Sequence, residues 1–238
     1  MNRTAVVCSV IAAGANVLGS VAVTARRRWS PSALEMLIAF SGGFLVSVAL
    51  VDMVPEAIVR NGPPAAWIML LGYLLVHLTQ HTIAPHFHFG EETHHVTQAV
   101  GVSALIGLML HMFVDGVAIA SGFDAGGRIG TLVLAAIALH KLPEGSAISS
   151  LFLAAGFSRR KALAAAVALG AATIFGALLT ESIAALSTYG LAISAGVTIY
   201  VAASNLVPEF QHKKGWRLPA AFFGGCAFFY LGQQLLNA

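Results

Sequence analysis

The sequence predicts an all-α polytopic membrane protein, and three observations support this class. The chain has 238 residues, of which 58% are hydrophobic and only 10% are charged, and its mean hydropathy is +0.82. A soluble domain carries roughly 25% charged residues, so this chain has too little polar surface to cover one. The apolar runs are continuous rather than alternating, which argues against a β-barrel. The basic residues lie at the ends of these runs, as in membrane proteins, and do not form a nucleic-acid-binding face.

Eight apolar runs between polar breaks predict eight transmembrane helices, since a span needs about 20 mostly apolar residues. Seven of the eight prolines fall near the ends of runs, whereas Pro143 lies within one. The first run is longer than a signal-peptide core and is followed by three arginines, so we interpret it as a span. The predicted spans, which together form a single transmembrane domain over residues 1–238, are residues 4–25, 32–56, 64–84, 97–122, 128–157, 160–185, 189–209 and 216–236.

The distribution of Lys and Arg predicts the orientation of these spans. If the loops after spans one, three, five and seven are cytoplasmic, they carry nine of the 13 basic residues. The other side carries three, and Lys141 lies within a span. The positive-inside rule therefore places both termini outside.

An internal repeat links spans two and seven. Residues 39–56 align with residues 192–209 at an offset of 153, and eight of the 18 positions are identical, including a shared Val-Pro-Glu ending. The two copies run in opposite directions through the membrane, so the repeat is inverted, as in many transporters with a site at the repeat interface. We therefore expect the eight spans in a 3+2+3 arrangement.

Spans four and five each carry a histidine and a carboxylate deep in the membrane. His111 and Asp115 lie at positions i and i+4, as do His140 and Glu144, so each pair shares one helix face. Two imidazoles and two carboxylates suit a borderline divalent cation such as Zn²⁺, and ionisable residues at this depth are usually functional. The alternative is two buried His–carboxylate hydrogen bonds that only hold the helices together.

With these residues the chain resembles a known protein family. Over nearly its whole length it resembles the Zrt/Irt-like (ZIP) metal transporters of prokaryotic type, through its eight spans, its His-rich third loop and the His111–Gly116 and His140–Glu144 segments. The resemblance implies that His111, Asp115, His140 and Glu144 are the ligands of the first metal position. It also implies a multi-pass protein of a bacterial cell membrane.

The chain departs from the family pattern at a second, adjacent metal position. The resemblance places Met112, Lys141 and, by spacing, Thr173 where many relatives have an Asn and two acids. A protonated ammonium cannot ligate a cation and repels one. We therefore expect a mononuclear site, in which Lys141 replaces the second metal and pairs with Asp115 or Glu144.

Polar residues outside the central spans are candidates for an ion path. We interpret Asp52 and Glu56 as candidates for the entrance and Glu209 as a candidate for the exit, although each can simply mark a helix end. Six of nine histidines fall within 19 residues around a predicted cytoplasmic loop at 86–96. These candidate loop ligands are His77, His81, His86, His88, His94 and His95.

The leading interpretation is an importer of divalent transition metals, with zinc first and Fe²⁺, Mn²⁺ or Cd²⁺ as alternatives, and not an enzyme. The expected partners are metal ions and the lipid bilayer, and we expect no resident cofactor and no nucleic acid. A homodimer is a further open alternative. Two other interpretations stay open at this point. One is an intramembrane zinc-dependent hydrolase that uses the same ligands, and the other is a metal-free, proton-linked channel or sensor.

Overall fold

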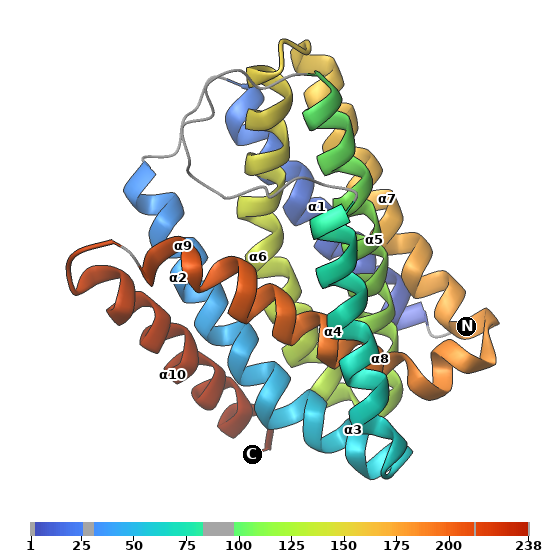
Figure 1. Cartoon of the computed structure of the whole chain (residues 1–238). Helices are drawn as coiled ribbons and strands as arrows, with labels where there is room; N and C mark the ends of the chain where they lie inside the picture. The colour runs from blue at the N-terminus through green and yellow to red at the C-terminus, as the bar shows by residue number, and fades with distance from the viewer. Residues whose placement is uncertain (1–2, 26–30, 83–97, 212, 238) are drawn as a thin grey trace.

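The computed structural model describes residues 3–25, 31–82, 98–211 and 213–237, and these residues form a bundle of helices (Figure 1). The helices are α1 (Arg3–Thr24), α2 (Pro31–Ser47), η1 (Val48–Met53), α3 (Val54–Asn61), α4 (Pro64–Thr82), α5 (Gln98–Ala125), α6 (Gly127–Ala154), α7 (Arg159–Ser182), α8 (Ala184–Tyr200), η2 (Val201–Leu206), α9 (Pro208–Gln211) and α10 (Arg217–Asn237). Because α2, η1 and α3 are continuous, and α8 runs on through η2 into α9, the described residues make eight helical rods.

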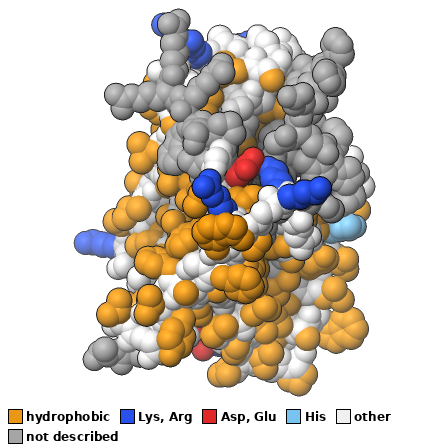
Figure 2. Space-filling view, turned by 90° about the vertical axis from the view of Figure 1, so that its left-hand side faces the viewer, with side chains coloured by type: hydrophobic (Ala, Val, Ile, Leu, Met, Phe, Trp, Pro, Cys, Tyr) orange, Lys and Arg blue, Asp and Glu red, His pale blue; other side chains and the backbone are white. Residues whose placement is uncertain are grey.

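The surface of the bundle is apolar, as a membrane protein requires. Five helices are long and apolar enough to cross a membrane: Arg3–Thr24, Glu35–Asn61, Gly101–Ala125, Arg159–Ser182 and Ala184–Leu206. Figure 2 shows hydrophobic side chains gathered over the middle and lower parts of one face. The polytopic helical class is therefore confirmed, while the count of eight spans and the outside position of the termini remain predictions.

Most helix ends lie within three residues of the predicted span ends, but the end of span two and the start of span seven, predicted at residue 189 and found at Ala184, are exceptions. We expected span two to end at residue 56, whereas the rod continues to Asn61 and ends at Gly62, which has a φ of +63°. Pro55 does not end the helix, because the preceding turn is a π-helix, η1, whose wider turn accommodates the missing N–H. In span seven, Pro208 likewise follows the π-helix η2, and the rod ends at Gln211.

The two copies of the repeat share this irregularity. The π-helices η1 and η2 begin and end 153 residues apart, which is the offset of the sequence repeat. Matching i→i+5 hydrogen bonds close them, from Val54 N to the Ala49 carbonyl and from Val207 N to the Ala202 carbonyl. Figure 1 shows the two segments running in opposite directions. The repeat is therefore present in the backbone as well as in the sequence.

Four helix pairs pack through reciprocal glycine contacts. In each pair, a Cβ added to a glycine on either helix would overlap a backbone carbonyl oxygen of the other. The glycines are Gly19 and Gly145 (α1 and α6), Gly116 and Gly176 (α5 and α7), Gly43 and Gly225 (α2 and α10), and Gly72 and Gly196 (α4 and α8). Small residues at such interfaces let membrane helices approach closely and form Cα–H···O contacts.

Two of these four glycine pairs are related by the internal repeat. Gly43 and Gly196 are 153 residues apart, as are Gly72 and Gly225, so the inverted repeat maps the α2–α10 pair onto the α8–α4 pair. The helices α5 and α6 lie at the centre, joined by a tight turn at Gly126, whose φ of +149° favours glycine. This turn makes α5 and α6 antiparallel neighbours.

Candidate metal centre

Four side chains from α5 and α6 converge inside the bundle. His111, Asp115, His140 and Glu144 are all at most 4% exposed. One candidate ligand atom from each lies within 4.8 Å of the others. Each helix supplies one His and one carboxylate at i and i+4, so the antiparallel packing of α5 and α6 brings the two pairs together. The predicted first-position residues therefore form one cluster.

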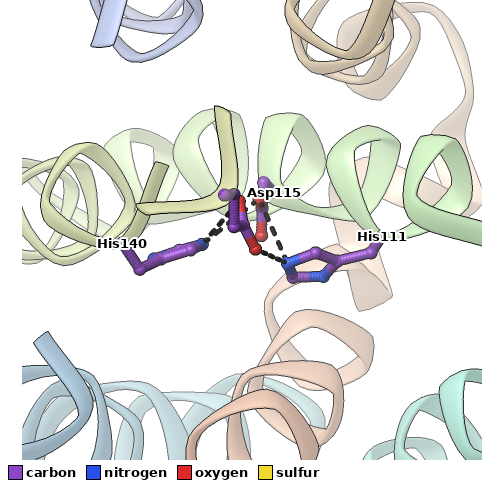
Figure 3. A group of neighbouring side chains, drawn as sticks. His111, Asp115 and His140 are labelled. Carbon is purple, nitrogen blue, oxygen red and sulfur yellow. Dashed lines mark hydrogen bonds and ion pairs between the residues drawn. The ribbon is translucent and has the colours of Figure 1, made fainter. Parts of the chain in front are cut away.

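Within the cluster, imidazole nitrogens face carboxylate oxygens. His111 Nε2 lies 3.1 Å from Glu144 Oε1 and 3.6 Å from Asp115 Oδ2. His140 Nε2 lies 3.5 Å from Asp115 Oδ2 and 3.8 Å from Glu144 Oε2. Figure 3 shows the rings of His111 and His140 on either side of the Asp115 carboxylate. Most of these separations exceed hydrogen-bonding distance, which leaves donors and acceptors only partly matched.

The tautomer of His140 supports a cation at this position. Its Nδ1 lies 2.9 Å from the Ala136 carbonyl oxygen, which can only accept, so Nδ1 carries a proton. In a neutral imidazole, Nε2 then directs a lone pair toward the carboxylates of Asp115 and Glu144. Among the described residues, His140 Nε2 and Glu144 Oε2 are buried without a hydrogen-bond partner. A divalent cation would satisfy these atoms together.

Lys141 lies directly beside the cluster and is fully buried. Its Nζ donates to Asp115 Oδ2 at 2.8 Å and contacts Met112 Sδ at 2.7 Å. Of the two carboxylates that we considered as its partner, the structure places Asp115 next to it. The ammonium therefore occupies the space between Asp115 and Met112, on the side of Asp115 where the resemblance placed a second metal.

Thr173, the third substitute at that position, is used differently. It is fully buried on α7, and its hydroxyl donates to the Leu169 carbonyl of the same helix at 3.4 Å. Its own carbonyl contacts Gly116, the residue that follows Asp115. On the other helix, Gly145 follows Glu144 and contacts the Asn16 carbonyl on α1. Close glycine packing next to both carboxylates therefore fixes their positions along α5 and α6.

The family comparison agrees with this geometry. Residues 77–232, more than half of the chain, match the model of a family described as ZIP zinc transporter. The chain belongs to the ZIP family. No curated protein matches it in sequence. As a ZIP protein it belongs with the divalent-metal transporters, and its apolar helices are those of a multi-pass membrane protein. This membership favours transport over the hydrolase and the metal-free channel or sensor.

The entrance candidates of this ZIP protein have partners at one end of the bundle. Asp52 lies in η1, is 4% exposed, and pairs with Arg128 Nη1 at 2.8 Å. Glu56 pairs with Arg60 at 3.0 Å on α3 and is partly exposed. The exit candidate, Glu209, lies in α9, and its side chain is outside the described part of the structure. Neither role is tested by these positions.

The loop histidines lie mostly beyond the described residues. His77 is exposed on α4, and the centroid of its ring lies 5.8 Å from that of the Tyr200 ring. His81 follows one turn later on α4, but its side chain is not among those described. The remaining four, at positions 86, 88, 94 and 95, fall within residues 83–97, outside the described ranges. Metal binding by this loop remains a prediction.

Sequence reasoning did not find the group around Asp52. Gln233 Nε2 on α10 donates to Asp52 Oδ1 at 3.2 Å, and Arg128 on α6 donates to the same oxygen. In the sequence, Arg128 is one of the three basic residues on the predicted outer side and indicates only the orientation of the spans. Because the three residues come from three separate helices, no spacing in the sequence connects them.

Proposed function

We propose that this ZIP family member imports divalent transition-metal cations, with zinc as its principal cargo, into the cytoplasm across a bacterial cell membrane. His111, Asp115, His140 and Glu144 are proposed to bind the ion at the middle of its path. The observation that carries the proposal is the convergence of four buried donors within 4.8 Å. Two imidazoles and two carboxylates form a ligand set suited to Zn²⁺, and equally to Fe²⁺, Mn²⁺ or Cd²⁺.

We propose that the centre holds one ion at a time. Ionised Asp115 and Glu144 supply two negative charges, and the ammonium of Lys141 offsets one of them. A single divalent cation then leaves the buried group with one net positive charge, whereas a second ion would leave three. Uncompensated charge is costly inside a membrane, so the contact between Lys141 and Asp115 supports a mononuclear site.

The proposed direction follows from the predicted orientation. With the Lys- and Arg-rich loops in the cytoplasm, Asp52 and Glu56 lie toward the outside and Glu209 toward the inside. An ion would meet these carboxylates before and after the central site. The His-rich loop at 86–96 would then meet the ion as it emerges. Both termini would face the outside.

Uptake into proteoliposomes tests the transport proposal. We expect Zn²⁺ entry, read by a fluorescent indicator in the lumen, to fall to the background of empty vesicles in Asp115→Asn and in His140→Ala. Asp124→Asn is a matched control, because it makes the same chemical change on α5 at an exposed position. Unchanged flux in folded Asp115→Asn and His140→Ala protein would refute the proposed ion site, and flux through the unmodified protein no higher than that of empty vesicles would refute the importer. Competition with Fe²⁺, Mn²⁺ and Cd²⁺ in the same assay ranks the cargo.

Metal stoichiometry tests the single-ion proposal. We expect crystals soaked in Cd²⁺ to show one ion among the four ligands. Two fully occupied ions bridged by Asp115 and Glu144 would contradict it. Lys141→Ala removes the ammonium, and we expect it to increase the number of Cd²⁺ ions bound at the centre.

A further inference from the structure

Besides Asp115 and Glu144 of the central cluster, a third carboxylate, that of Asp52, is buried elsewhere in the bundle. The Asp52 side chain is 2% exposed, and it accepts two hydrogen bonds, from Arg128 Nη1 at 2.8 Å and from Gln233 Nε2 at 3.2 Å. Both bonds go to Oδ1. Among the described residues, Oδ2 is buried without a hydrogen-bond partner. Half of this carboxylate is therefore unsatisfied.

Such an arrangement is incomplete for a structural ion pair. Arginine commonly binds a carboxylate in a bidentate manner, with two parallel N–H···O bonds. Here the guanidinium reaches one oxygen only, and a buried charged atom left without a partner carries a substantial desolvation cost. The lone pairs of Oδ2 are the groups that a metal ion would use, since Asp and Glu oxygens also bind Zn²⁺.

This group is spatially separate from the central site. Arg128 and His140 lie on the same helix, α6, and are 12 residues apart, which corresponds to about 18 Å along the axis. The Arg128 side chain is 33% exposed, whereas that of Asp52 is almost fully buried, so the guanidinium lies between the carboxylate and the surface. A cation that approaches Asp52 from this end of the bundle meets Arg128 first.

We propose that Asp52 and Gln233 form a second divalent-cation position, and that the guanidinium of Arg128 occupies this position as a built-in competitor. The positively charged Arg128 and a divalent cation repel each other at contact distance, so binding is mutually exclusive. When Arg128 leaves, Asp52 offers both oxygens. The Gln233 amide, which now donates to Oδ1, can rotate to offer its own oxygen. The inference rests on the proposed function for the nature of the cargo. At the proposed entrance, Asp52 would be the metal ligand and Arg128 the group that competes with the metal.

The test measures Cd²⁺ binding and does not depend on transport. The full chain is purified in detergent in an Asp115→Asn/Glu144→Gln background, which removes the central carboxylates, and Cd²⁺ is titrated by calorimetry. Relative to this background, we expect Arg128→Gln to strengthen Cd²⁺ binding at least tenfold at one additional site per chain. Adding Asp52→Asn should abolish this gain.

Two controls separate local competition from general electrostatics. Arg60→Gln removes a positive charge at the same end of the bundle, from a pair with the partly exposed Glu56, and should give no gain. Arg128→Lys keeps the charge and should also give none. The proposal is overturned if Arg128→Gln binds no more Cd²⁺ than its background, if the gain survives Asp52→Asn, or if Arg60→Gln produces the same gain.

A second measurement keeps Arg128 in place. In the same central-site background, we expect Cd²⁺ to accelerate phenylglyoxal modification of Arg128 severalfold, read by mass spectrometry of its peptide, because the ion displaces the guanidinium. Arg60 serves as the internal reference and should not respond. Modification of Arg128 that is unaffected by Cd²⁺ would overturn the proposal even if Arg128→Gln failed to fold. Because the central carboxylates are absent and both results are read as changes at Asp52 and Arg128, neither result depends on whether the importer proposal holds.

Discussion

Substitution of Gly145 by alanine should lower stability although alanine is the better helix former. A Cβ at this position would overlap the Asn16 carbonyl oxygen on α1 and would lie 2.8 Å from the carbonyl carbon, whereas ordinary contact begins at 3.4 Å. The backbones of α1 and α6 must therefore separate by half an ångström or more. Overpacking of this kind costs about 1–3 kcal/mol. The gain in helix propensity, at most about 1 kcal/mol, opposes it only in part.

We therefore expect Gly145→Ala to destabilise the protein by about 1–2 kcal/mol, which lowers Tm by roughly 2–8 °C in a chain of this length. Thermal unfolding in detergent, followed by tryptophan fluorescence, measures the change. Gly14→Ala on α1 is the matched control, because no described atom lies within 4 Å of its added Cβ, and its Tm should stay level or rise. Equal Tm values for Gly145→Ala and the unmodified protein would refute this account of the helix contacts.

Four further substitutions test three other contacts by the same unfolding assay. Asn16→Ala removes a buried 2.8 Å hydrogen bond to a backbone carbonyl of α7 and should cost about 1–3 kcal/mol. Lys213→Ala should change stability by less than about 1 kcal/mol, because its 2.8 Å pair with Glu35 is more than one-third exposed. The hydroxyls of Ser20 and Ser149 lie 2.6 Å apart in the core. The double variant Ser20→Ala/Ser149→Ala should lose less stability than the sum of the two single variants, since each single variant leaves one buried hydroxyl without its hydrogen-bond partner.

The central site could be predicted because its information is local. His111 and Asp115 share one helix face through their i, i+4 spacing, as do His140 and Glu144, and the short α5–α6 turn makes the two helices neighbours. The pairing partner of Lys141 was not local and stayed open. Side chains lean toward the N-terminus of their helix, so Lys141 points away from Glu144, which lies C-terminal to it. It therefore reaches Asp115 on the neighbouring helix instead.

The Asp52 group and the full length of span two could not be predicted. Arg128 and Gln233 lie 76 and 181 residues from Asp52, and only the packing of α6 and α10 against η1 brings them together. Pro55 resembles the end of a helix in sequence, because proline removes a hydrogen bond from an α-helix interior. The π-turn that makes it acceptable has no comparable sequence signal. Irregular backbone and contacts between three helices are therefore what the sequence leaves undetermined.

The two π-helices also change which side of the following helical segment faces the interior of the bundle. Leu45, Ala49, Met53 and Ala57 are all buried, so the inward face recurs every fourth residue across η1. In an unbroken α-helix a step of four residues advances by about 400°, and three steps would turn this stripe by about 120° away from the interior. The wider π-turn cancels much of that drift. Across η2 the buried residues likewise recur every fourth position, at Thr198, Ala202 and Leu206. Removing one residue from either π-turn would rotate the outlying segment by about 100°, and α3 or α9 would then turn its other side to the bundle.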